Sequence, residues 1–354
     1  MFFKKAIKKI SAVLTAGIIG LTLTFAPAPA STTSTASAAE MSLKESNTTL
    51  EGQNYWLNYW KKEKGVSSDP NKNARLHSMM TQLTNAVAKL DPSINDLPYV
   101  YFVNNDTSFN AFCTMAHVMS VNSGAFDLVA NDDELAAIVG HEMGHGQKDH
   151  PYKGYKSAQQ KVLWANIAGA VIGGGQLTNI AGNLLLTHSI AHGTKRNEKE
   201  ADDLAFNYIV QTSYNPGACA AIWQRVMDKY ESTGEQSKIE MFFNPSDHPN
   251  HLARRDKYVQ KLYEYSGKHV TVKDGMVGVN SKEFIKPAAT SNMSSEERAY
   301  FVLGNLAVAY HNGQDKYNAT VSNGTVYLGN QAIITPASGD ESAQAIADKL
   351  NSIK

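Results

Sequence analysis

The spacing of apolar and polar positions divides the chain beyond residue 40 into four stretches. Apolar and aromatic residues recur at helical spacing over residues 40–95, which predicts helices that bury one face. Residues 98–121 are rich in β-branched and aromatic types and predict strands. Residues 122–265 return to helical spacing, and residues 266–354 change to short β-type runs separated by glycine turns.

One predicted helix has marked ends and an apolar body. Asn131 can cap its start, and Glu134 three residues later would complete a capping box. His150-Pro151 is expected to end it, because the residue before a proline avoids helical geometry. Residues 136–140 are almost wholly apolar, so we expect this helix to be buried.

The last stretch contains an internal repeat. Residues 271–277 align without gaps with residues 320–326, and the turns Asp274-Gly275 and Asn323-Gly324 both favour a β-hairpin. A helical pattern follows each copy. We therefore expect a small α+β domain, residues 266–354, made of two hairpin-helix units that pack together, since one unit cannot bury its own apolar face. This domain serves either as a packing module or for docking to partners or the cell wall.

The first residues have the order of a targeting signal. Four lysines precede an apolar run over residues 12–25 and a small-residue segment that reaches Ala38-Ala39. This order predicts a signal peptide, residues 1–38, and an exported mature chain in the periplasm, the cell envelope or outside the cell. The alternative is an uncleaved membrane anchor, although the apolar run is short for a span of about 20 residues.

Composition narrows the class of partner. The 354 residues carry 33 basic and 33 acidic side chains, so charge gives no case for a nucleic acid and we expect none. Residues 162–194 lack Lys, Arg, Asp and Glu, which leaves either peripheral contact with a membrane or envelope protein, or a buried helical pair. The two cysteines, Cys113 and Cys219, could form a disulfide after export or stay as separate buried residues.

The strongest chemical signal is His141-Glu142-Met143-Gly144-His145 within the apolar helix. Residues four apart share a helix face, so His141 and His145 can bind one zinc ion together. Glu142 lies beside that face, where it can accept a proton from a water on the metal. The alternative, two solvent-exposed histidines, fits poorly because buried His and Glu side chains need partners.

A catalytic zinc site needs a third protein ligand from elsewhere in the chain. His150 is nearest, but five residues along a helix turn it about 140° away from His145. The acidic segment at residues 198–202 is the better source. Glu198 and Asp202 lie one turn apart, so Glu198 can ligate zinc while Asp202 holds the second ring nitrogen of a ligand histidine. Glu200 falls on a nearly opposite face. The alternative is an acidic, solvated helix face.

At this point the chain resembles the gluzincin metallopeptidases that include the CAAX prenyl protease, the HtpX protease and the periplasmic BepA-type peptidases. The resemblance implies an α+β fold, a mainly helical zincin-type peptidase domain at residues 39–265 with a small β-sheet. It does not extend to the repeat. Four blocks carry it: Asn110-Ala111-Phe112 with Val121-Asn122-Ser123-Gly124, Asp133-Glu134-Leu135-Ala136 with the His141–His145 motif and His150, Glu198–Asp202, and His248-Pro249 with Arg254.

The resemblance also implies how the site residues are used. His141, His145 and Glu198 would hold one Zn²⁺ ion per chain, Glu142 would act as the general base, and Asp202 would support a ligand. A peptide or unfolded protein would be the substrate, and it would add as a strand to an exposed sheet edge. We place this edge at residues 117–121 and expect substrate contacts from Asn110, His117, Val118, Met119 and Ser120.

Four further residues depend on the same resemblance. The pair Ala116-His117 stands where relatives often carry Gly-Gly, a departure that affects the shape of the substrate edge. His248 could donate to the oxyanion of the reaction as a catalytic residue, could enter as a fourth zinc ligand that keeps the enzyme latent, or could have no role. Arg254 is expected to tie the His248 turn to the core or to a carboxylate near the site.

Together these patterns predict a zinc-dependent endopeptidase that acts on exported or envelope proteins, in protein quality control. The alternative is a chaperone-like or binding protein that keeps the zinc site but works by holding its substrates. The complete set of ligands together with Glu142 favours the enzyme.

Overall fold

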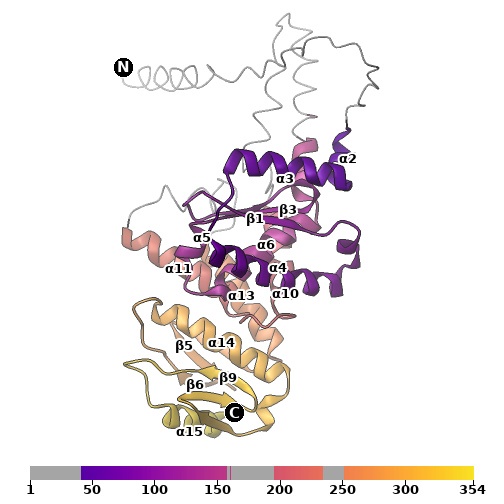
Figure 1. Cartoon of the computed structure of the whole chain (residues 1–354). Helices are drawn as coiled ribbons and strands as arrows, with labels where there is room; N and C mark the ends of the chain where they lie inside the picture. Colours follow the sequence, from indigo (N-terminus) through magenta and orange to yellow (C-terminus); the bar gives the residue numbers. More distant parts are fainter. Residues whose placement is uncertain (1–40, 158–159, 161–194, 234–250) are drawn as a thin grey trace, which may run out of the picture. The chain divides into compact units, whose positions relative to one another are not determined.

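The computed structural model describes residues 41–157, 160, 195–233 and 251–354. The predicted signal peptide, residues 1–38, and the uncharged stretch at residues 162–194 therefore lie outside the described residues. The first described stretch is helical, as its spacing predicts: α2 (Leu43–Thr48), α3 (Leu50–Lys64), α4 (Pro70–Leu90) and the short 3₁₀ helix η1 (Pro92–Asn95) (Figure 1). Asp69 accepts two backbone hydrogen bonds at the start of α4, where Pro70 occupies the first turn.

A three-stranded sheet follows, with one strand that the sequence pattern did not reveal. Its strands, and the 3₁₀ turn before the last of them, are β1 (Val100–Asn104), β2 (Ala111–Cys113), η2 (Met115–His117) and β3 (Val118–Asn122). The strand order is β1-β3-β2, with β3 parallel to β1 and antiparallel to β2. Val118 packs in the cluster that contains Trp56 of α3, whereas Met119 faces the main core. Helices therefore cover both faces of the sheet.

The next helices supply most of the predicted site: α5 (Ala125–Leu128), α6 (Asp132–Gln147), α10 (Lys195–Ile209), α11 (Ala218–Thr233) and α13 (His251–Tyr265). Asn131 caps α6 as predicted, but the Glu134 carboxylate accepts from Ala130 N–H rather than from the cap residue. The predicted end at His150-Pro151 is wrong. Helix α6 ends at Gln147, and a new helix begins at His150 with the proline in its first turn, where no N–H is needed.

The repeat is confirmed, but each copy holds a third strand that the prediction lacked. The first copy contains β4 (Val270–Lys273), β5 (Met276–Val279), β6 (Lys282–Ile285) and α14 (Ser295–His311). After the 3₁₀ helix η3 (Gln314–Lys316), the second contains β7 (Ala319–Ser322), β8 (Thr325–Leu328), β9 (Gln331–Ile334) and α15 (Ala343–Ile353). Asp274-Gly275 and Asn323-Gly324 have the positive φ angles that their hairpin turns require.

The two copies contact each other, as predicted. Arg298 of α14 pairs with Asp340, 2.7 Å away in the second copy, and the same carboxylate accepts the backbone N–H of Ala288 in the first. Asn305 of α14 donates to the backbone oxygen of Ile333 in β9. Residues 41–354 form a compact unit, and the division at residue 265 stays a prediction.

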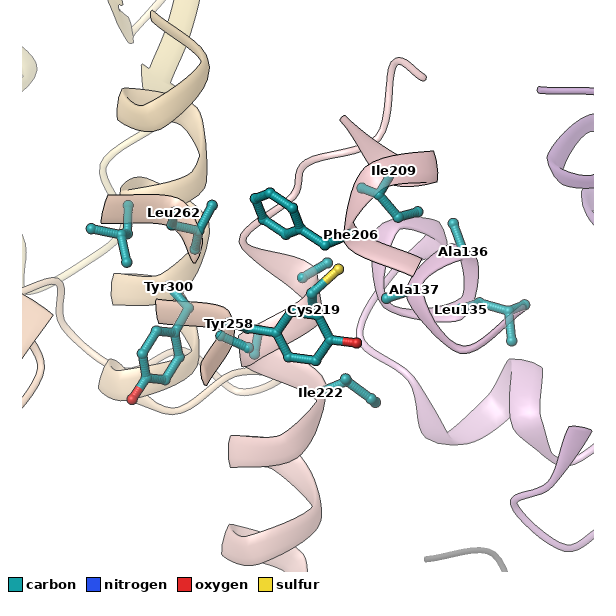
Figure 2. Close-up of a cluster of buried hydrophobic side chains, with 14 of the residues drawn as sticks. Leu135, Ala136, Ala137, Phe206, Ile209, Cys219, Ile222, Tyr258, Leu262 and Tyr300 are labelled. Atoms are coloured by element: carbon teal, nitrogen blue, oxygen red, sulfur yellow. The ribbon is translucent and has the colours of Figure 1, made fainter. Parts of the chain in front are cut away.

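The core that surrounds the candidate site comes from helices distant in sequence. Figure 2 shows apolar side chains of α6, α10, α11, α13 and α14 meeting in one cluster. The apolar cluster of Figure 2 holds α6 against α10.

Cys113 and Cys219 are both buried and free, which contradicts a disulfide between them. In the described part of the chain, no helix combines the length and hydropathy needed to cross a membrane.

Candidate metal centre

Small residues allow α6 to lie close to α10. Gly144 lies against the backbone of Ala201, where an added Cβ atom would meet the Ala201 oxygen at 2.9 Å. Gly140 lies against Ala205 in the same way, at ordinary van der Waals distance. Because no larger side chain separates the helices here, the carboxylate of Glu198 on α10 can reach the histidine face of α6.

This contact brings together three side chains that could hold a metal ion. The ligand atoms of His141, His145 and Glu198 all lie within 4.8 Å of one another, and all three residues are buried. The two Nε2 atoms are 3.1 Å apart, and the Glu198 oxygens lie 3.4 Å from His141 and 3.3 Å from His145. Two imidazoles and one carboxylate converging on a point form a donor set that fits a divalent cation of the zinc type.

The other ring nitrogen of His141 is held by a buried carboxylate. His141 Nδ1 lies 3.0 Å from Asp202 Oδ1, and Asp202 also pairs with Arg254 and accepts from the Tyr258 hydroxyl. The Arg254 guanidinium lies 3.8 Å from the ring centre of Trp223. The sequence suggested Asp202 and Arg254 but missed the other two, although Tyr258 lies one helical turn from Arg254 on α13.

The pKa values of His141 and His145 shift in opposite directions when no ion is bound. Burial and the Arg254 cation disfavour a charged His141, but its bonds with Asp202 and Glu198 outweigh them and raise its pKa to about 9. Burial lowers the pKa of His145 to about 4. Asp202 remains ionised, because Arg254 and His141 overcome the effect of burial and hold its pKa below the ordinary value. A cation bound at this site would therefore displace a proton from His141.

His150, rejected as a ligand from its spacing, contacts His145 instead. Its Nδ1 lies 3.0 Å from His145 Nδ1, and its Nε2 lies 3.3 Å from the carboxylate of Glu200. His150 is not part of the three-residue ligand group. Its spacing along a continuous helix would have turned it away, but the break after Gln147 returns it to the site.

Glu142 lies next to the ligand face and is fully buried. Its Oε2 accepts the backbone N–H of Cys113 at 3.1 Å, which connects the motif helix to strand β2. Burial raises the pKa of Glu142 to about 8, so this carboxylate is poised to exchange a proton near neutral pH. His248, the other predicted catalytic residue, lies outside the described residues.

The sequence profile described as Peptidase family M48 matches residues 70–261, which is more than half of the chain and includes the whole metal centre. This chain belongs to peptidase family M48. The resemblance inferred from the motifs is thereby confirmed, and an α+β, mainly helical architecture agrees with it. The M48 match ends before the C-terminal repeat.

Three proteins to which this chain is similar are proteases by name. Metalloprotease LoiP of Escherichia coli is 30% identical over 183 residues, which cover 50% of this chain and 67% of LoiP. The beta-barrel assembly-enhancing protease of E. coli is 22% identical over 46% of this chain and 35% of its own length. The mitochondrial metalloendopeptidase OMA1 of Schizosaccharomyces pombe is 28% identical over 50% of this chain and 51% of its own. The matches to the last two thus span about half of each relative or less.

One predicted feature of this M48 domain is wrong: residues 117–121 are not a sheet edge. Strand β3 is central, with Val118, Met119 and Ser120 paired to β1 on one side. On its other side it pairs with β2, a ladder that continues in the bond from Thr114 N–H to the Val118 oxygen. No further strand can add to a strand that is paired on both sides. The edge next to Glu142 is β2.

The turn between β2 and β3 contains two non-glycine residues in a left-handed conformation. Ala116 and His117 both have positive φ, 57° and 56°, which glycine adopts more easily. Asn47 and Gln53 of the N-terminal helices hold this turn by bonds to the Ala116 backbone. The His117 ring stacks on Tyr99, and its Nδ1 contacts the Leu97 oxygen. These contacts occupy His117 in packing and leave its predicted substrate role without support.

Proposed function

We propose that this M48 protein is a zinc-dependent endopeptidase that hydrolyses peptide bonds of exported or envelope proteins in protein quality control. The observation that carries the proposal is the convergence of His141, His145 and Glu198 beside the buried carboxylate of Glu142. An arrangement of three ligands leaves a coordination position for water, as hydrolytic zinc sites require. One zinc ion per chain is therefore the expected cofactor.

The chain's own residues divide the chemistry between binding and proton transfer. A zinc ion held by His141, His145 and Glu198 would supply a water of lowered pKa and polarise the scissile carbonyl. Glu142 acts as the general base that takes the water proton and passes it to the leaving amine. Its pKa of about 8 in the metal-free site is consistent with both halves of this transfer. Asp202 orients His141, and Arg254 keeps Asp202 in place.

Substrate binding is proposed at the outer edge of β2. Residues 110, 112 and 114 use their backbone groups to pair with β3. The two ends of this pairing are the bond from Asn122 N–H to the Asn110 oxygen and the bond from Thr114 N–H to the Val118 oxygen. Ala111 and Cys113 consequently direct their backbone groups to the other side, where the Cys113 N–H donates to Glu142. An extended peptide that pairs there would place its carbonyl groups beside the general base. Asn110, whose buried Oδ1 lacks a hydrogen-bond partner among the described residues, is the proposed side-chain contact.

The choice of exported and envelope proteins as substrates rests on two supports. One is the signal peptide predicted at residues 1–38. The other is the name of one relative, the beta-barrel assembly-enhancing protease, because β-barrels are typical proteins of bacterial outer membranes. Contact with a membrane surface or an envelope protein is a further proposal. His248 remains a candidate oxyanion donor: lower activity of His248→Ala would support that role, and higher activity would support a latent enzyme.

The decisive experiment uses the mature chain, residues 39–354, with Glu142→Gln and Glu198→Ala variants. Zinc content and casein cleavage are measured on each, and Glu264→Ala, at an exposed position of α13, is the matched control. The proposal expects about one zinc per chain in the wild type, zinc loss in Glu198→Ala and loss of cleavage in both variants. Wild-type protein without zinc would overturn it. Zinc without cleavage, with full cellular function of Glu142→Gln, would favour a holding protein.

A further inference from the structure

His150 is a buried histidine placed between a predicted metal ligand and a carboxylate. Only 2% of its surface is exposed. The chain reaches this position through a tight turn in which Asp149 has a positive φ of 53° and its carboxylate accepts from the Asn47 side chain. The turn is thus built from residues outside α6, and it returns the His150 ring to the end of the motif helix.

The order of atoms in this contact determines where the protons lie. His145 presents Nε2 to Glu198 and His141, so in the metal-binding form its ring proton must be on Nδ1. That Nδ1–H points to His150 Nδ1, 3.0 Å away, which must then accept. A neutral His150 that accepts at Nδ1 carries its own proton on Nε2, where Glu200 Oε2 lies 3.3 Å away and accepts it.

We propose that His150 is a positioning residue that fixes the ring orientation and the Nδ1–H tautomer of His145, and that Glu200 fixes the tautomer of His150. This inference rests on the proposed function, because it concerns a ligand of the same site. The two ligand histidines are then supported differently: His141 directly by the Asp202 carboxylate, and His145 through an intervening imidazole. Glu200 is half-exposed and also pairs with Arg196, so we expect it to affect the tautomer of His145 less than His150 does.

A purely structural role for His150 is the competing explanation, and ring-nitrogen NMR distinguishes the two. In protein with ¹⁵N-labelled histidine, nitrogen shifts report which ring nitrogen carries the proton, with His145 and His150 assigned from single variants. Metal-free and zinc-loaded protein are both measured. We expect His150 protonated at Nε2 and His145 at Nδ1. A His150 protonated at Nδ1 in the zinc-loaded protein would overturn the proposal, because it would leave the His145 N–H without an acceptor.

Metal affinity provides the second readout, from three variants. His150→Leu removes the acceptor and should weaken zinc binding by about 10–100-fold, the usual effect of losing the group that supports a metal-bound histidine. His150→Asn keeps an acceptor near the position of Nδ1 and should recover most of this loss. Glu200→Ala should fall between the wild type and His150→Leu. The matched control is His77→Leu, since His77 lies on α4 and contacts Tyr101 instead.

The outcomes separate this inference from the function on which it rests. Wild-type protein that fails to bind zinc would overturn the proposed function, while the tautomers of the metal-free protein would still be measured. Tight zinc binding in the wild type with an unchanged Kd in His150→Leu would overturn the positioning role alone. Thermal unfolding of the metal-free variants shows whether the fold is intact. If His150→Leu does not fold, a Kd for His150→Asn as weak as that of Glu198→Ala would count against the proposal.

Discussion

Glu142 and Cys113 are joined by a hydrogen bond from the Cys113 backbone N–H to Glu142 Oε2, 3.1 Å long. The bond links the motif helix α6 to the edge strand β2, although 29 residues separate the partners. It gives the general base a fixed position relative to the strand where we propose that substrate pairs. Because it holds the carboxylate through one oxygen, the geometry of the base depends on the strand as well as on the helix.

The proposed general base leads to the first prediction. Glu142→Gln keeps the shape of the side chain and can still accept from Cys113, but it cannot take a proton. We expect kcat to fall by about 10²–10⁴-fold while zinc content and the free energy of unfolding stay close to wild type. Steady-state cleavage of a fluorogenic peptide, together with metal analysis, checks this. Retained kcat in Glu142→Gln would exclude Glu142 as the base.

The corrected sheet order leads to a second prediction. Ala111→Pro removes a backbone N–H that points away from β3, so the β2–β3 pairing should survive. We expect peptide turnover to fall by about tenfold, the effect of losing one main-chain hydrogen bond to substrate, with zinc content unchanged. Ser120→Pro is the contrasting variant. It breaks a central ladder and should lower the unfolding temperature. Equal turnover in Ala111→Pro and wild type would argue against substrate pairing at β2.

The sequence could predict which side chains meet in the candidate metal site because their positions repeat along two helices, whereas it could not predict strand order. His141 and His145 are four residues apart on one helix, and Glu198 and Asp202 repeat that spacing on another, so the local period puts each pair on one helix face. That the two faces meet was implied by the family resemblance and not by the period. Strand β2 has three residues, too few for an alternation to show. Whether β3 is central or at an edge depends on pairing between segments, which the sequence pattern alone does not reveal.

His150 shows a related limit of reasoning from helical period. Its five-residue separation from His145 places it off the ligand face only if the helix continues. A break at Lys148 and a positive φ at Asp149 change its direction. Asp149 is a residue type that tolerates this conformation, so a signal for the turn existed. The bond from Asn47 that holds the turn comes from 102 residues away and has no local signal.

Arg254 leads to a third prediction, about stability. Its guanidinium is 4% exposed and pairs with Asp202, so Arg254→Met leaves this buried carboxylate with His141 as its remaining charged partner. Breaking one side of a buried pair usually costs about 3–5 kcal/mol, and we expect a loss of that size in the free energy of unfolding. Urea denaturation measures it. Arg255→Met, one residue along on the same helix, is the matched control and should cost about 1 kcal/mol or less. Equal losses in the two variants would contradict a special role for Arg254.

The pKa values of the ligand histidines lead to the last prediction, on the pH dependence of zinc binding. In the metal-free protein His141 has a pKa of about 9, and His145 one of about 4. Zinc binds only neutral imidazole, so below about pH 9 it must displace a proton from His141 and none from His145. Zinc affinity should therefore rise by about tenfold per pH unit from pH 6 toward 9 and then level off.

Asp202 provides the test of that cause, because its carboxylate is a principal reason for the raised pKa of His141. Asp202→Asn removes this negative charge, so the plateau in zinc affinity should begin at a lower pH. Competition with a chelator of known pH dependence gives the affinities, and calorimetry in buffers of different ionisation enthalpy counts the protons released. An affinity that is flat between pH 6.5 and 8.5 would mean that His141 is already neutral. In that case the Asp202 bond would orient the ring without holding a proton on it.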